Sequence, residues 1–191
     1  MSTSRSSRQY LYELTNSCKN IIDATQQMFS PLDTHQLNWK PAPDSWSVAQ
    51  CLDHLNTTNT AYYGVIEPLL PPAGVTGGAA DRPFRSGIMG SIMIWTLQPN
   101  RRIKMSAPRA IAPSQSALPH AVIDDFAASQ QQLLIYIERS AGLDLTSISL
   151  TSPLSSFVRL NLGAAYGIMV THTQRHLLQA SRVMQRQGFP S

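Results

Sequence analysis

Four stretches of the chain place apolar side chains at every third or fourth position, and this periodicity constrains the fold most. The stretches cover residues 9–29, 46–67, 120–141 and 162–187. Spacings of three and four gather side chains on one face of an α-helix, whereas a strand would alternate them. Strand signals are few. The sequence therefore predicts an all-α protein, a four-helix bundle whose helices each bury one stripe in a shared core.

Local signals predict where these helices begin and end. Pro31 ends the first helix, because the residue before a proline is disfavoured in the α region. Ser47 and Gln50 have the spacing of a capping box and begin the second helix. Gly142 suits the end of the third helix. Residues 37–46 and the Ser- and Thr-rich run 145–163 are predicted to be connections.

A long insertion rich in proline and glycine separates the second and third helices. Residues 71–120 hold seven of the thirteen prolines and five of the ten glycines. A structureless loop of that length is unusual inside a compact domain. We therefore expect the apolar run 87–98 to form a short helix or turn over one end of the core. We expect residues 1–191 to make a single domain.

Composition places the chain among globular proteins. Apolar residues make up 42% of it and charged residues 14%, below the usual quarter. Cys18 and Cys51 form no C-x-x-C pair and cannot build a disulfide framework, so we expect a reduced, cytoplasmic protein. The first residues lack the apolar core of a signal peptide. The apolar run 87–97 is too short to span a bilayer, and no membrane partner is predicted.

A cluster of basic residues follows that apolar run and raises the question of nucleic-acid binding. It comprises Arg101, Arg102, Lys104 and Arg109. The cluster is short, lies beside prolines and belongs to no known reading motif. A solvated loop is the favoured interpretation, and no nucleic-acid partner is predicted.

Two histidines stand four residues apart on the inward stripe of the last helix. At this spacing the imidazoles of His172 and His176 can converge on one metal ion. The alternative is a pair of core histidines, each of which would need its own polar partners. The last helix by itself does not separate these two interpretations.

A third histidine is placed to join them. His54 borders the inward stripe of the second helix, whereas His35 and His120 are expected to be exposed. Three histidines leave a position open for water or substrate, as in catalytic rather than structural metal sites. Competing patterns are missing, since the sequence contains no H-E-x-x-H and no Glu-x-x-His pair of the di-iron bundles.

The order and spacing of these residues resemble a known family. The run NWKPAPDSWSVAQCLDHL at 38–55 is similar to the entry into the second helix of DinB/YfiT-like metalloenzymes, and H-x-x-x-H on the last helix completes their pattern. The matching residues here are Trp39, Pro41, Trp46, Ser47, His54, Leu55, His172 and His176. The resemblance covers most of the chain, although its 71–120 segment departs from the family pattern.

The resemblance implies both a site and a type of chemistry. It implies a divalent metal, zinc or nickel and sometimes iron or manganese, on His54, His172 and His176. It also implies a homodimer and a small-molecule substrate, with activity like that of thiol S-transferases or hydrolases that use a thiol cofactor. An ion held by three neutral imidazoles would activate a water or a thiol.

Two points stay open in the sequence. A non-catalytic metal or small-molecule binding protein would need the same three histidines, and no residue is assigned as a separate catalytic group. Three polar residues each lie near one of these histidines on its helix. They are candidates to contact and orient the metal-binding histidines, and they are Asp53, Asn56 and Gln179.

Overall fold

The computed structural model describes residues 5–72, 74, 81–101, 111–113, 115 and 117–191. Of the basic cluster predicted at 101–109, only Arg101 belongs to these residues. The elements in chain order are α1 (Ser7–Phe29), α2 (Thr34–Asn38), α3 (Val48–Ile66), a 3₁₀ turn (Glu67–Leu69), α4 (Gly87–Leu97), α5 (Val122–Arg139), β1 (Ser149–Thr151), β2 (Arg159–Asn161) and α6 (Leu162–Met184).

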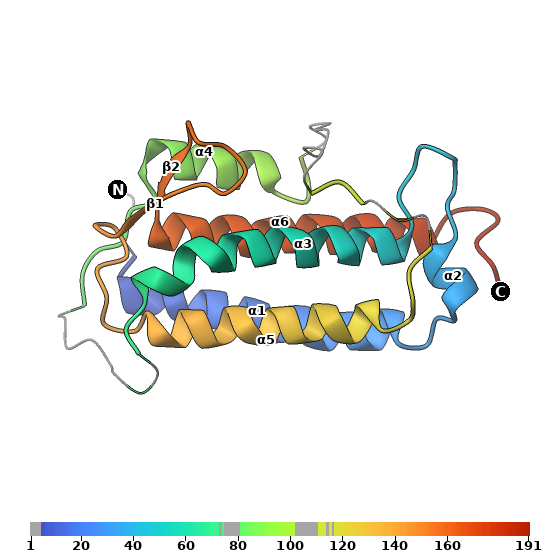
Figure 1. Ribbon diagram of the computed structural model, residues 1–191, viewed down its shortest axis with the longest axis horizontal. Helices are drawn as coiled ribbons and strands as arrows, with labels where there is room; N and C mark the ends of the chain where they lie inside the picture. Colours follow the sequence, from blue (N-terminus) through green and yellow to red (C-terminus); the bar gives the residue numbers. More distant parts are fainter. Residues whose placement is uncertain (1–4, 73, 75–80, 102–110, 114, 116) are drawn as a thin grey trace.

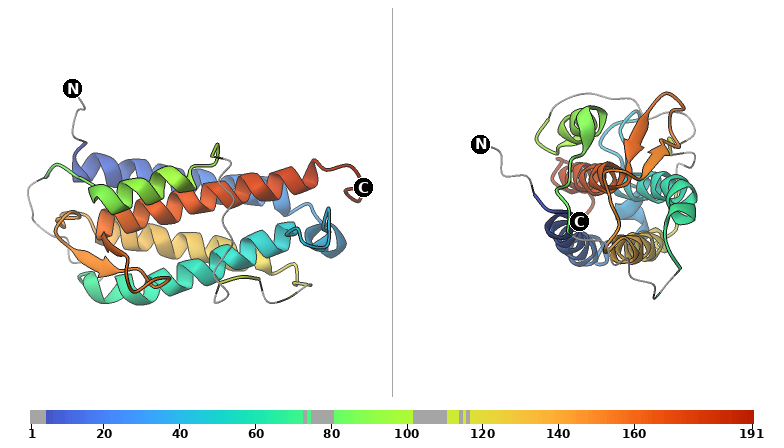
Figure 2. Two further views of the ribbon diagram at one scale, coloured as in Figure 1. Left: turned by 90° about the horizontal axis from the view of Figure 1, so that it is seen from above. Right: turned by 90° about the vertical axis from the view of Figure 1, so that its left-hand side faces the viewer.

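Four long helices form the body of the molecule, and the predicted four-helix bundle is confirmed. The helices α1, α3, α5 and α6 run along the long axis (Figure 1) and occupy the corners of a square in the end view (Figure 2). Around the square, α1 packs against α5 and α6, and α3 packs against the same two helices. No helix in the described part of the chain is long and apolar enough to cross a membrane.

The direction of the helices explains the long insertion. Colours in Figure 1 show that α3 and α5 are neighbours that run the same way, whereas α3 and α6 run in opposite directions. A chain that leaves the end of α3 must therefore return along the whole bundle before α5 can begin. The segment between them makes this return. As predicted, residues 87–97 within it form a helix, α4, which packs on α6 at one end of the bundle.

Capping signals locate the helix starts well. Ser47 Oγ accepts a hydrogen bond from the Gln50 backbone N–H at 3.1 Å, and the Gln50 side chain accepts one from the Ser47 N–H at 3.2 Å. This is the predicted capping box. A second box, formed by Asp33 and Gln36, begins α2, a short helix that the sequence did not predict. Its five residues are too few for an apolar period to stand out.

The other differences lie at helix ends and in the last connection. Helix α5 ends at Arg139, earlier than predicted, and Gly142 follows with a φ of 81°. The connection before α6 contains a short antiparallel hairpin in which Leu150 pairs with Leu160. Three-residue strands with one buried position each give almost no alternation to read.

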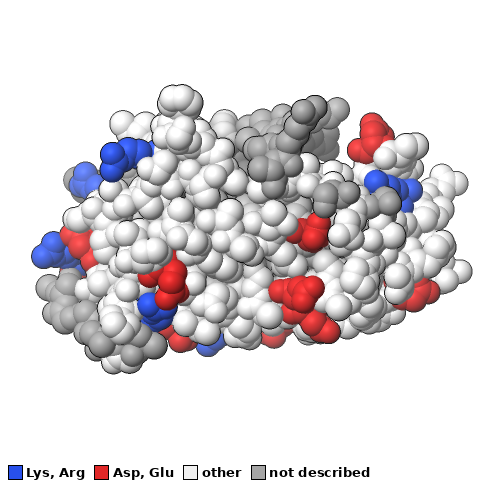
Figure 3. All heavy atoms as spheres, viewed as in Figure 1, with Lys and Arg blue, Asp and Glu red and all other residues white. Residues whose placement is uncertain are grey.

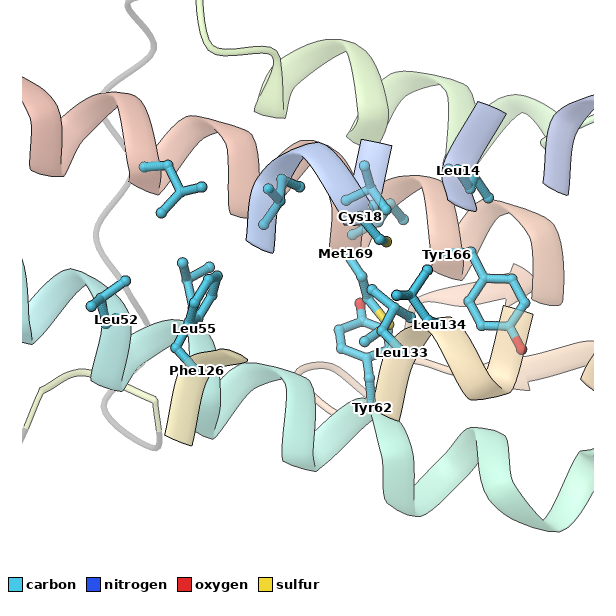
Figure 4. Packing of buried hydrophobic residues seen from close by; sticks show 14 of the residues in the cluster. Leu14, Cys18, Leu52, Leu55, Tyr62, Phe126, Leu133, Leu134, Tyr166 and Met169 are labelled. Carbon is cyan, nitrogen blue, oxygen red and sulfur yellow. The ribbon is translucent and has the colours of Figure 1, made fainter. Parts of the chain in front are cut away.

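The core fills the space between the four helices (Figure 4). Each helix contributes apolar side chains whose exposure is near zero, among them Cys18 from α1, Leu55 from α3, Phe126 from α5 and Met169 from α6. Within each helix, the buried side chains recur at the spacings of three and four that predicted the helix. The apolar stripes read from the sequence are therefore the surfaces that meet in the bundle.

Glycines let the insertion approach α6 closely. A Cβ atom added at Gly90 of α4 would lie 2.6 Å from the Cβ of Ala164 on α6. A Cβ at Gly163 would overlap the ring of Phe84. Real Cβ atoms do not come so near, so larger residues would push α4 and the segment before it away from the bundle.

Candidate metal centre

The three predicted histidines come from two neighbouring helices. His54 lies near the middle of α3, in a register that begins at the Ser47 cap, and His172 and His176 lie one turn apart on α6. Because α3 and α6 are antiparallel neighbours, residues near the middle of each can meet. The structure brings these side chains together, although His54 and His172 are 118 residues apart in the chain.

The imidazoles are close enough to share one ion. One nitrogen from each ring can be chosen so that all three lie within 4.8 Å of one another. The Nε2 atoms of His54 and His172 are 3.2 Å apart. Two nitrogen–zinc bonds of about 2.0–2.1 Å at a tetrahedral angle span roughly 3.3 Å. The ring centres are 5.0 Å apart for His54 and His172, and 4.6 Å for each pair that includes His176.

Burial keeps these imidazoles neutral. Burial is the largest cause of a lowered pKa in all three residues. The pKa of His54 is lowered, that of His172 lies well below the ordinary value, and that of His176 falls to about 3. Mutual repulsion between the rings and the nearby positive charge of Arg175 act in the same direction on the α6 pair. A metal ligand must be a neutral imidazole, so the site is ready for an ion at neutral pH.

A backbone carbonyl from the insertion orients His54. The Nδ1 atom of His54 lies 2.6 Å from the carbonyl oxygen of Ile111. A carbonyl can only accept, so Nδ1 carries the proton and Nε2 keeps its lone pair on the side of His172. Metal-bound histidines generally donate their other nitrogen in this way. Sequence reasoning missed this contact, because a backbone carbonyl has no signature in the sequence.

Two further features suit a bound cation. The Nδ1 atom of His176 is buried and has no hydrogen-bond partner among the described residues. Such a nitrogen is costly unless a partner such as a metal ion or one of its ligands supplies the missing interaction. The side chain of His172 keeps part of its surface exposed, so the cluster reaches the molecular surface. The residues present therefore fit a divalent ion.

Trp46 covers one side of the cluster. Its ring stacks on His176 at a centroid distance of 5.5 Å and an interplanar angle of 19°, and it lies 4.9 Å from the ring of His54. The residue belongs to the run 38–55 that resembles the family pattern. An indole over two imidazoles restricts their rotation and lowers the polarity on that side.

The three residues suggested as supports have different surroundings. Asp53 is partly buried, which raises its pKa, and its charge acts to raise the pKa of His54. Gln179 acts to raise the pKa of His176. The Oδ1 atom of Asn56 is buried with no hydrogen-bond partner in the described part of the chain. Asp53 and Gln179 thus interact with the cluster, whereas no such contact is seen for Asn56.

The remaining histidines and the cysteines lie apart from this chemistry. His35 and His120 are exposed, as predicted, and the Nε2 of His120 lies 3.1 Å from the carbonyl oxygen of Leu32. Cys18 and Cys51 are free and buried, and burial raises the pKa of both thiols to about 12. Neither thiol is a reactive nucleophile at neutral pH.

A concavity elsewhere on the surface has a different character. A groove of about 380 Å³ lies between α1 and α6, and its lining includes no histidine and no charged side chain. Its residues are Ser17, Asn20, Ile21, Ala24, Met28, Gln174, Leu177, Leu178 and Ser181. The groove therefore lacks the groups that could carry out chemistry.

Fold and site together define a class: a four-helix bundle with three histidines that could hold a metal ion at the interface of two of its helices. The family model of the DinB superfamily matches residues 19–180, a range that covers most of the chain and includes the three histidines. The chain belongs to the DinB superfamily. No curated protein and no solved structure matches the chain significantly.

Proposed function

We propose that the protein is a divalent-metal-dependent enzyme whose ion is held by His54, His172 and His176. The observation that carries this proposal is the convergence of the three ligand atoms within 4.8 Å of one another, in a cluster that reaches the surface at His172. Three neutral imidazoles leave the charge of an ion uncompensated. Zinc or nickel suits nitrogen ligands, and iron or manganese is also compatible.

A bound ion would supply Lewis acidity, which lowers the pKa of a water or a thiol toward neutrality. The residues of this chain would do the rest. The Ile111 carbonyl holds His54 in the tautomer that presents Nε2, and Trp46 restricts the rings of His54 and His176. The substrate would enter beside His172, where the cluster is only partly buried.

The substrate class follows from the family resemblance together with the site. We expect a small molecule with an electrophilic centre, attacked by water in a hydrolase or by a thiol cofactor in an S-transferase. The buried cysteines, with pKa values raised to about 12, do not offer the thiol, so a thiol nucleophile would come from outside the chain. The homodimer remains a prediction of the same resemblance, and the cytoplasmic location remains a prediction from the two cysteines.

Metal content and ligand exchange test the proposal. Protein purified without an affinity tag should contain about one divalent ion per chain by mass spectrometry. His54→Ala, His172→Ala and His176→Ala should each lose it, while the matched variants His35→Ala and His120→Ala keep it. The cobalt-substituted protein should change its visible spectrum when a small thiol is added, because a thiol occupies the open position.

The alternative is a protein that binds metal without turnover. It predicts the same metal content, but a cobalt spectrum that thiols and azide leave unchanged and no thiol transfer to a model electrophile. Full-length protein that stays metal-free after dialysis against zinc would contradict both functions. The three histidines would then be core residues.

A further inference from the structure

Helix α4 is apolar on two opposite faces. One face packs against α6, where Gly90 meets Ala164 and Ile94 meets Gly167. The other face points away from the bundle and carries Ile88, Ile92 and Trp95 at spacings of four and three. Their side chains are 84%, 51% and 47% exposed. A surface helix normally turns polar residues outward, so this outer face is unusual.

The β1–β2 hairpin extends the same surface. Strand β2 packs beside α4, and Figures 1 and 2 show the hairpin and α4 on the same side of the bundle. Phe157, in the loop between the strands, is 94% exposed. We define the α4–hairpin face by its exposed apolar residues, which are Ile88, Met89, Ile92, Trp95 and Phe157. Exposed apolar groups gathered in this way mark an interaction surface.

The charged residues on this face and next to it are mainly basic. Arg85, Arg101 and Arg159 are exposed on or next to the same elements, and the Arg101 guanidinium lies 4.1 Å from the ring centre of Trp95. Segments 85–101 and 145–161, which contain α4 and the hairpin, hold three of the fifteen Lys and Arg residues and none of the eleven Asp and Glu residues. Figure 3 shows blue and white but no red spheres over α4 and the hairpin.

Three kinds of partner can be compared on these observations. A nucleic acid would use the arginines and could stack its bases on Trp95 and Phe157, but it gains nothing from the aliphatic side chains of Ile88 and Ile92. A second copy meeting this face would use the apolar residues but would bring like charges together, which is costly. An anionic bilayer surface uses both, because apolar side chains enter the interface while basic ones attract the headgroups.

We propose that the α4–hairpin face docks peripherally on an anionic lipid bilayer. Ile88, Ile92 and Trp95 enter the interface, with Phe157 beside them, and the three arginines lie at the level of the headgroups. The sequence predicted no membrane partner because no segment can span a bilayer. Peripheral docking needs no such segment, and it became visible only when the structure placed the hairpin beside α4.

Sedimentation with vesicles tests the proposal on the full chain. The wild-type protein should sediment with vesicles of phosphatidylcholine and phosphatidylglycerol, and far less with vesicles of phosphatidylcholine alone. Ile92→Glu should weaken binding to the anionic vesicles by roughly tenfold or more, because it places a charge in the apolar layer. Its control is Ile135→Glu on α5, since Ile135 is 45% exposed and lies outside the α4–hairpin face.

A second pair of variants tests the electrostatic part. Arg85→Glu should weaken anionic binding by about fivefold or more, whereas Lys19→Glu on the exposed side of α1 should have little effect. The loss of binding caused by Arg85→Glu should become smaller at high salt, because salt screens the attraction to the headgroups. A melting transition measured for each variant serves as the control that the variant is folded.

Trp95 offers a measurement that leaves the α4–hairpin face itself unchanged. In the Trp39→Phe/Trp46→Phe protein, emission should shift to the blue on anionic vesicles and should be quenched by brominated lipid. An unchanged spectrum, equal binding to neutral vesicles, or equal losses in Ile135→Glu and Ile92→Glu would overturn the proposal. So would a dimer in sedimentation velocity that Ile92→Glu dissociates, because the face would then join two copies.

Discussion

The Nδ1 atom of His54 and the carbonyl oxygen of Ile111 lie 2.6 Å apart, although 57 residues separate them in the chain. This contact ties the insertion to the bundle at the cluster itself. It also decides which nitrogen of His54 remains available. The cluster takes its imidazoles from two helices, but the orientation of His54 depends on a third segment.

The tautomer of His54 is the most direct prediction from this contact. In the metal-free protein at neutral pH, His54 should carry its proton on Nδ1, because the carbonyl can only accept. Two-bond proton–nitrogen correlation spectra distinguish the tautomers. The exposed His35 serves as the reference for an imidazole without such a constraint. A proton on Nε2 of His54 would contradict the geometry described above.

Metal should stabilise the folded protein. A ligand that binds only the folded state at about one hundred times its Kd adds about 2.7 kcal/mol to the free energy of unfolding. Calorimetry should therefore show a higher Tm with zinc, which a chelator reverses. The increase should vanish in His176→Ala and persist in His120→Ala. Equal increases in both variants would mean that zinc binds elsewhere.

The stability of the metal-free protein should fall in mild acid because of the cluster. Burial lowers the folded-state pKa of His176 to about 3, while an unfolded chain titrates near the ordinary 6.5. Stability from this residue is therefore complete above pH 6.5 and is lost as the pH falls toward 3. Between pH 7 and pH 5 the loss is about 2 kcal/mol.

Denaturant titrations of the chelated protein at pH 7 and pH 5 measure this effect. His176→Gln cannot be protonated, so its free energy of unfolding should change less than that of the wild type over this interval. His35→Gln should behave like the wild type, because His35 is exposed. Parallel changes in wild type and His176→Gln would show that His176 is not held neutral by burial.

Two glycine substitutions should have opposite effects on stability. An added Cβ at Gly64, which is exposed on α3, meets no atom within 4 Å, so Gly64→Ala should stabilise the helix by about 0.5–1 kcal/mol. An added Cβ at Gly163 overlaps the ring of Phe84, so Gly163→Ala should cost about 1–3 kcal/mol. Urea unfolding measures both changes, and equal signs would contradict the packing of Phe84 on α6.

The sequence predicted the bundle because its signals are local. Apolar spacing identified the four long helices, and the capping residues Ser47 and Gln50 located the start of α3. The histidines could be grouped because inward faces follow from the same periodicity. The short elements were less predictable: α2 and the hairpin strands contain too few residues to show a period.

Features that depend on distant contacts could not be read in this way. The Ile111 carbonyl and the stacking of Trp46 on His176 arise from the packing of segments far apart in sequence. The outward face of α4 was equally hidden, since the apolar run 87–98 predicted only a short helix or turn over one end of the core. Burial by a neighbour is decided by tertiary structure rather than by hydropathy.

The contact between the insertion and His54 also has a consequence for how such proteins can diverge. All three imidazoles belong to the bundle, and the insertion contributes a main-chain carbonyl rather than a side chain. Any amino acid at position 111 could offer that oxygen if the backbone kept its path. Substitutions and changes of length in the returning segment can therefore accumulate around a fixed set of ligands. Selection could reshape the surroundings of the cluster while the chemistry it supports is inherited unchanged.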